Sequence, residues 1–359
     1  MSLGDLVPLR SFRTICGGGI GVAVCPALGL VVTSNCIGNT LSVFTLPQSI
    51  STPSASDTGL ALVCTLGGAS SPPPMQFKFL GGDGFSGWMA FTGPAISRLL
   101  LLTDTGHDAV HVIDVAGQVH AGYVAAPGTI AGPRGVAARG SLVAVSAWKE
   151  YGCGDHVVRV FEGSGARWTA TRELAGGFGG PGRANGQLDR PLGLRFTGDG
   201  TGLVVTEAGK GRVSLFRVED GSFVRHVATG LACPYDVEEC EGGWLVACQS
   251  SHTIQFVDGG GVVRARLGKR GSGHGDFSFP SALALVPGVG LVVRELGNIR
   301  LQIFATPDAI AMSSMSAARV GWMVAVARGA AHRASSATSQ RQQAGSTGKR
   351  RRRQRGSMV

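Results

Sequence analysis

Histidines are the side chains in this sequence that are best suited to hold a metal ion. His107, His252 and His274 each stand in a stretch rich in Gly, Ser, Asp or Gln, which predicts a loop, and His156 lies near another loop. Three imidazoles and a water molecule form a common catalytic zinc site, so His107, His252 and His274 are metal-ligand candidates. Their positions share no motif spacing, and we therefore assign no metal and no cofactor.

A second group of side chains suits partner binding. The loop from Trp148 through Lys149 to Tyr151 places two aromatic rings beside a cation. Aromatic residues and Arg supply much of the binding energy at protein interfaces, so we expect this loop to contact a partner. The alternative for Trp148 is that its ring packs down onto the protein. The full set of expected partner-binding residues is Arg134, Trp148, Lys149, Tyr151, Arg183, Arg190, Lys269 and Arg270.

Motifs for nucleotide or acyl chemistry have no support. Residues 271–275 carry Gly at alternate positions, as dinucleotide-binding loops do, but no helix is predicted after them to receive a phosphate. The sequence contains no Walker motif and no Gly-x-Ser-x-Gly turn between a strand and a helix. Nucleophilic and phosphoryl-transfer reactions are therefore not indicated.

The elements that must position these residues form a unit that recurs six times. The clearest copy has a Gly-rich loop from Gly268 to Pro280, followed by the apolar segments 282–286, 291–295 and 301–304. Repeats of about 40 to 50 residues that consist mostly of strands indicate the blades of a β-propeller. The third strand of each unit contains an apolar residue at the same place: Phe44, Ile113, Phe161, Phe216, Phe256 and Phe304.

The strand patterns agree with an all-β, six-bladed propeller. The second strand of each unit, such as Leu99–Asp104, is a continuous apolar run, as expected for a strand covered on both faces. Fourth strands, such as Val262–Leu267, alternate apolar and polar residues. Only five fourth strands follow the six third strands, and Ser11–Cys16 resembles the missing one. We therefore predict that the N-terminal strand completes the last blade and closes the ring, because closure removes open sheet edges.

Two segments fall outside the repeats. An insert at about residues 48–71 is rich in Ser, Thr and Pro, and residues 308–359 form a basic Ala/Ser/Arg-rich tail that we expect to be disordered. The propeller domain is thus predicted to span residues 1–307. Residues 309–359 carry ten of the 33 Lys and Arg and no acid, which leaves 23 basic and 23 acidic residues in the remainder. The net charge of +10 belongs to the tail and gives no argument that the propeller binds nucleic acid.

Other features favour an intracellular protein, cytoplasmic or nuclear. The eight cysteines show no Cys-x-x-Cys pair, and several lie within apolar strands, which favours reduced structural thiols. The N-terminus lacks the apolar core of a signal peptide, and the apolar run 322–327 is too short to cross a membrane. The basic run 349–355 is either a nuclear-localisation signal or a solvated terminus with affinity for polyanions.

The loops and strands resemble NHL repeats. The segment 295–304 reads ELGNIRLQIF and the segment 207–216 reads EAGKGRVSLF, close to the family signature, and the other four copies are degraded. The resemblance covers about 300 residues and implies a six-bladed propeller. The Glu at the end of the second strand is expected to accept hydrogen bonds from loop amides and to pair with the following Arg.

This resemblance implies two functions of different classes. Propellers of the TRIM-NHL group bind RNA or proteins through their loop face, although the upstream zinc domains and coiled coil of that group do not appear here. Related six-bladed enzymes include metal-dependent amidoglycolate lyases and gluconolactonase-type hydrolases, but no histidine follows a loop proline as in the lyases. We favour a non-catalytic platform for a protein partner, with RNA as a second candidate through the loop face and the tail, over a metal-dependent lyase or hydrolase. A membrane partner is not expected.

Overall fold

The structure is a computed structural model that describes residues 7–13, 19–46, 60–79, 87–92, 99–149, 156–165, 167–172, 182, 184–286 and 290–305. The chain divides into two units, Met1–Ala309 and Ile310–Val359, and the described residues all belong to the first. They form β-strands and one short 3-10 helix, Pro26–Leu28. None of the described segments is a helix with the length and apolar character needed to cross a bilayer.

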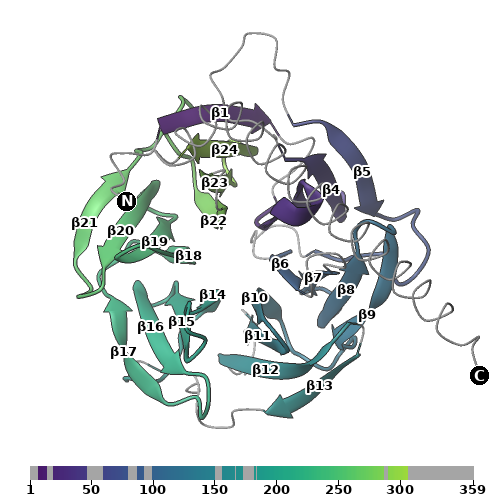
Figure 1. The fold of residues 1–359 in the computed structure, drawn as a ribbon, viewed down its shortest axis with the longest axis horizontal. Helices are drawn as coiled ribbons and strands as arrows, with labels where there is room; N and C mark the ends of the chain where they lie inside the picture. Colours follow the sequence, from purple (N-terminus) through teal and green to yellow (C-terminus); the bar gives the residue numbers. More distant parts are fainter. Residues whose placement is uncertain are drawn as a thin grey trace, which may run out of the picture. The chain divides into compact units, whose positions relative to one another are not determined.

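Six antiparallel four-stranded sheets stand in a ring (Figure 1). Blade 1 contains β2 (Val22–Cys25), β3 (Leu30–Asn35), β4 (Thr40–Thr45) and β5 (Leu62–Gly67). Blade 2 contains β6 (Met89–Thr92), β7 (Leu99–Asp104), β8 (Ala109–Asp114) and β9 (Val119–Ala125). Blade 3 contains β10 (Pro133–Arg139), β11 (Leu142–Ala147), β12 (Val157–Ser164) and β13 (Arg167–Arg172). A single parallel bridge, between Arg167 and Tyr123, joins the sheets of blades 2 and 3.

The second half of the ring repeats the same order. Blade 4 contains β14 (Pro191–Phe196), β15 (Gly202–Glu207), β16 (Arg212–Arg217) and β17 (Phe223–Ala228). Blade 5 contains β18 (Pro234–Cys240), β19 (Gly243–Cys248), β20 (Thr253–Asp258) and β21 (Val263–Leu267). Blade 6 contains β22 (Pro280–Val286), β23 (Gly290–Glu295), β24 (Arg300–Ala305) and, as its outer strand, β1 (Val7–Arg13). The predicted six-bladed, all-β architecture is confirmed.

The N-terminal strand closes the ring, as the sequence predicted. β1 pairs antiparallel with β24 from Val7 opposite Ala305 to Arg13 opposite Arg300, and Figure 1 shows it on the outer rim. The strand lies about four residues earlier than the predicted segment Ser11–Cys16, whose last three residues lie outside the described part. The inner strands contact one another in the cycle β2, β6, β10, β14, β18, β22 and back to β2.

The hydrophobic core lies between neighbouring blades. Five of the six apolar clusters join one blade to the next, and the sixth joins blades 2 and 3 and also includes Ile20, Leu192 and Tyr235, so every blade is covered on both faces. In one cluster Val205 and Phe216 of blade 4 pack with Leu194 of the same blade and with Ala144 of blade 3. This arrangement explains the continuous apolar second strands, because alternate side chains of such a strand enter two different clusters.

The motif carboxylates tie the loops to the blades in the way that the NHL resemblance implied. Glu295 is fully buried, and its carboxylate accepts hydrogen bonds from Arg300 Nε at 2.5 Å and from the backbone N–H of Ser278 at 2.8 Å. Glu207 has the same role in blade 4, where it accepts from Arg212 Nε at 2.8 Å. Charge-assisted bonds of this kind hold the Gly-rich loops against their blades.

Candidate functional site

The sequence predicts the partner-binding residues on the face of the propeller that contains the turns between second and third strands and the loops that lead into the inner strands. We call it the loop face. Its turns end on a residue with positive φ in five blades, which fixes the same tight hairpin each time. These residues are Asn39, Asp108, Gly211, His252 and Ile299.

Trp148 packs down onto the protein, which is the alternative that the sequence left open, so its expected place among the exposed partner-binding residues is wrong. Its side chain is only 2% exposed, and the Arg134 guanidinium lies over the indole ring, 4.5 Å from its centroid. Arg190 approaches the same ring at 5.8 Å. Arg134 is itself 2% exposed, so neither it nor Trp148 offers a side chain to a partner on this surface. Stacking of guanidinium on indole stabilises the buried arrangement.

The remaining predicted residues that the structure describes belong to three blades. Lys149 is exposed on blade 3, and its Nζ contacts Asp108 Oδ2 of blade 2 at 2.7 Å. Arg190 is exposed and precedes the inner strand of blade 4, whereas Lys269 and Arg270 are exposed before the inner strand of blade 6. Tyr151 and Arg183 lie outside the described residues.

The blade-6 corner of the loop face combines apolar and cationic side chains. We define it as Lys269, Arg270, Phe279 and Ile299. Phe279 is 39% and Ile299 38% exposed. The backbone N–H groups of residues 296 and 297 donate to the carbonyls of residues 279 and 278, which holds the Ile299 turn beside Phe279.

His252 of blade 5 lies beneath this corner. Its ring centroid is 4.5 Å from that of Phe279, and its Nδ1 accepts the Phe279 N–H at 3.1 Å. Burial and, to a lesser degree, the nearby charge of Arg270 lower the pKa of His252 below its usual range. The uncharged His252 ring therefore packs against Phe279 and accepts its N–H near pH 7. The sequence analysis missed Phe279 and Ile299, although an apolar residue in a turn of the loop face was a signal that could have indicated them.

The candidate metal ligands do not form a site. His107, His252 and His274 belong to loops of three different blades, and within the described part of the chain no three His, Cys, Asp or Glu side chains are grouped to hold a metal ion. His107 instead bonds through Nδ1 to Asp104 Oδ2 at 2.9 Å. His274 is exposed.

Blade 2 contains a buried histidine chain that the sequence analysis did not single out. His111 takes the place that Gln302 has in blade 6 and contacts Asp104 Oδ2 through Nε2 at 3.2 Å. Its Nδ1 contacts His120 Nε2 at 3.1 Å. Burial, followed by the charge of His111, lowers the pKa of His120 to about 4. These polar groups hydrogen-bond to one another inside the blade. The histidine chain therefore takes the place of the Arg–Glu pairs of blades 4 and 6.

The central channel offers a second candidate site. In each blade, one residue of the inner strand pairs with the next-to-last residue of the second strand. These inner-strand residues therefore lie at one level of the channel. The six residues at this level are Gly21, Trp88, Gly135, Gly193, Asp236 and Ala282. Two positions further along, the residues are Ala23, Ala90, Ala137, Arg195, Glu238 and Ala284. Blades 2, 4 and 5 thus supply every large side chain of these two levels.

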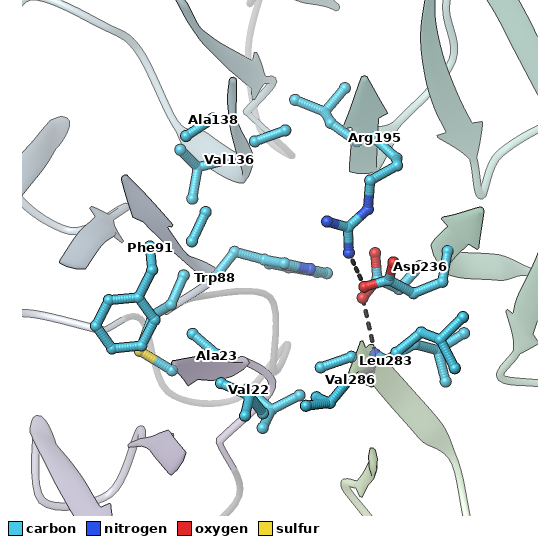
Figure 2. Close-up of a pocket in the computed structure, with 18 of the residues that line it drawn as sticks. Val22, Ala23, Trp88, Phe91, Val136, Ala138, Arg195, Asp236, Leu283 and Val286 are labelled. Carbon is cyan, nitrogen blue, oxygen red and sulfur yellow. Dashed lines mark hydrogen bonds and ion pairs between the residues drawn. The ribbon is translucent and has the colours of Figure 1, made fainter. Parts of the chain in front are cut away.

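The charged residues of the channel contact one another. Arg195 Nη2 forms an ion pair with Glu238 Oε1. Asp236 accepts the backbone N–H of Val237 at Oδ1 and that of Leu283 at Oδ2, both at 2.9 Å. Figure 2 shows Arg195 and Asp236 converging on the same space. Burial raises the pKa of Asp236 to about 6, although these hydrogen bonds and the Arg195 charge act in the opposite direction.

Gly193 shows how closely the channel residues pack. A Cβ on Gly193 would lie 2.4 Å from Asp236 Oδ1 and 2.7 Å from the Tyr235 carbonyl oxygen. Any side chain here would displace the carboxylate or the backbone of blade 5. Glycine at this position therefore allows the Asp236 carboxylate to approach blade 4 and Arg195.

A cavity of about 530 Å³ occupies the channel beside these residues. Its described lining extends from Trp88 and Asp236 to Pro26, Ala27 and Val286, where first strands lead into second strands, and includes no residue of the loop face. The Trp88 indole points into this space (Figure 2). Trp88 is 4% exposed, and its ring centroid is 6.2 Å from that of Tyr235. The cavity and the blade-6 corner are therefore separate sites.

Comparison with known proteins gives the fold but no family. No protein-family model and no curated protein matches the chain. Among solved structures, a chain in the crystal structure of a nidogen/laminin complex has a similar fold, with a TM-score of 0.50 and 14% sequence identity over 69% of this chain and 78% of that chain. At this identity the likeness concerns architecture only. The chain is thus an all-β, six-bladed propeller, and its NHL character remains a prediction.

Proposed function

We propose that this propeller is a non-catalytic platform that binds a protein partner at the blade-6 corner of the loop face. The observation that carries the proposal is the exposure of Phe279 and Ile299 at the end of a loop that also exposes Lys269 and Arg270, whose backbone pairs with that of Phe277. Apolar groups surrounded by charged ones are the usual composition of a small protein-binding surface. The solved structure of similar fold is itself a complex of two proteins, nidogen and laminin, which is consistent with this role.

The charges of the corner favour an acidic partner. Within the described residues neither Lys269 nor Arg270 has a carboxylate within ion-pair distance, whereas Lys149 on blade 3 is already paired with Asp108. Unpaired cations on a rim mainly accelerate association and select partners of opposite charge. A segment with an apolar side chain flanked by Asp or Glu therefore suits this surface.

RNA is the alternative ligand of the same cations. RNA recognition by single-strand binders relies on several cations and on aromatic rings that stack on bases. The corner has one partly exposed ring, Phe279, and two cations, so it fits an acidic protein segment better than an RNA strand. We propose that residues 1–307 form the propeller and residues 308–359 a basic tail, and that the protein is intracellular. The tail is then a second segment that could bind RNA.

Site-specific photo-crosslinking in cells tests the proposal. A photoreactive phenylalanine analogue at position 299 of the full-length chain should give crosslinked products that resist ribonuclease and disappear with protease. The same analogue at Val224, which is 47% exposed on the outer strand of blade 4, is the matched control. The double change Lys269→Glu and Arg270→Glu should abolish the products from position 299. Ribonuclease-sensitive products would favour RNA, and identical products from positions 299 and 224 would refute a specific site.

A further inference from the structure

The channel cavity has the size and polarity of a small-molecule site. About 530 Å³ lies within the range of pockets that enclose small ligands, about 300 to 1,000 Å³. Half of its lining residues are Ala or Val, and the surface that the lining exposes to the cavity is more polar than apolar. Small side chains leave the space open, and a few polar groups converge on one end of it, as in sites that orient a small ligand.

Two hydrogen-bond donors at the polar end have no acceptor among the described residues. They are Trp88 Nε1–H and Arg195 Nε–H, and both atoms are buried. Trp88 as a whole is 4% exposed, and its indole points into the cavity (Figure 2). A buried donor without an acceptor is unfavourable, so a ligand oxygen at this position would be favoured.

Acceptors lie beside these donors. Each oxygen of the Asp236 carboxylate accepts one backbone N–H and retains a lone pair, and Glu238 uses Oε1 for Arg195. Asp236 is 8% and Glu238 5% exposed, so both are shielded from bulk water. The site therefore presents donors and acceptors together, which is the pattern that complements a hydroxyl group.

The charges exclude strongly ionic ligands. One cation and two carboxylates make the polar end neutral or negative, depending on whether Asp236 carries a proton, and the one cation is already paired with Glu238, so a dicarboxylate or phosphate would find no countercharge. A cation would place a second positive charge beside the Arg195 guanidinium, and the two like charges would repel each other. An uncharged ligand meets neither penalty.

We propose that the channel binds a small uncharged polyhydroxylated molecule of about monosaccharide size. One hydroxyl oxygen accepts from Trp88 Nε1–H and Arg195 Nε–H, and a neighbouring hydroxyl donates to Asp236. The C–H surface of the ligand packs against the indole ring and the Ala wall formed by Ala90, Ala137 and Ala284. This site is independent of the blade-6 corner, because the two share no residue.

The Trp88 indole N–H provides a direct probe in a proton–nitrogen NMR spectrum of the full-length protein. Loss of one of the five indole signals in Trp88→Phe assigns the Trp88 peak. Myo-inositol, D-glucose and glycerol are then added separately, with malonate and choline as charged comparisons. At least one of the three polyols should shift the Trp88 peak saturably below about 100 mM, by more than malonate or choline does.

Two variants locate the binding. Ala284→Leu fills the cavity while keeping the Trp88 peak visible, and it should weaken polyol binding by about tenfold or more. Val224→Leu, which introduces the same side chain on the outer strand of blade 4, should leave binding unchanged. If no polyol moves the Trp88 peak, or if a charged comparison moves it more, the proposal is wrong. It is equally wrong if Ala284→Leu binds as tightly as the unaltered chain.

Discussion

Removal of the Glu295 carboxylate should destabilise the propeller far more than removal of an exposed carboxylate. Glu295 is fully buried and accepts bonds from four groups: Arg300 Nε at 2.5 Å, Asn298 Nδ2 at 2.6 Å, Gln302 Nε2 at 2.8 Å and the Ser278 N–H at 2.8 Å. The change Glu295→Ala leaves the Arg300 guanidinium, which is 8% exposed, without its counter-charge.

The expected magnitude follows from the burial of that cation. Breaking a buried ion pair by deleting one partner costs about 3 to 5 kcal/mol, a large part of a total stability of about 5 to 15 kcal/mol. Part of the cost is recovered because Arg300 also donates to the carbonyls of Ser272, Gly273 and Asp276. We therefore expect a loss of about 3 kcal/mol, the lower end of that range. Glu295→Gln, which keeps the acceptor oxygen, should lose less.

Urea-induced unfolding of the full-length protein, followed by tryptophan fluorescence, measures this loss from the midpoint and slope of the transition. The matched control is Asp220→Ala, which removes a carboxylate that pairs with Arg217 and accepts the Ser222 N–H. The Asp220 and Arg217 side chains are 53% and 55% exposed. That change should leave the midpoint almost unaltered, because exposed ion pairs contribute little. Equal effects of Glu295→Ala and Asp220→Ala would refute the view that the motif carboxylate fastens its loop to the blade.

Three further outcomes are expected. Deletion of residues 1–16 removes β1 and exposes the edge of β24, so the truncated chain should elute as aggregates in size-exclusion chromatography; a monomer with unchanged melting would contradict ring closure. The pKa of Asp236 is raised from 3.8 to about 6, so the folded state favours the protonated carboxyl. This contribution to the free energy of unfolding is complete below about pH 4 and is lost as the pH rises through 6. Relative to Asp236→Asn, the unaltered chain should therefore lose about 3 kcal/mol of stability between pH 4 and 7 in urea unfolding. Burial raises the pKa of Cys240 to about 11 and that of Cys248 to about 12. Both thiols should therefore resist iodoacetamide at pH 8 until the protein is denatured, as measured by mass spectrometry. Rapid labelling of the native protein would show instead that the blade-5 strands open readily.

Strand identity could be predicted from the sequence because each blade is covered on both faces. The run Leu99–Asp104 is apolar at successive positions since its alternate side chains enter different interblade clusters. The closing strand was recognisable from pattern, but it begins four residues before the predicted segment because pairing with β24, not local preference, sets its start. The Glu295–Arg300 pair followed from its motif, since both partners lie in one hairpin.

The burial of Trp148 could not be predicted in the same way. Whether that indole turns outward or inward depends on Arg134 and Arg190, which reach it from the starts of two different inner strands. Stacking between residues of separate blades leaves no periodic signal in the sequence. The exposed pair Phe279 and Ile299 was missed for a related reason, since only the hairpin contacts between residues 279 and 296 bring them together.

The sequence by itself determined the number of blades, the order of their strands and the ring closure, because all three depend on local periodicity and on a repeated motif. The tertiary structure decided which side chains meet across the channel. Trp88, Arg195 and Asp236 come from three blades. At the two levels of the channel where they lie, most other blades carry only Gly or Ala. Local periodicity records that a strand is buried, but only closure of the ring determines which inner strands face one another and thereby creates the cavity.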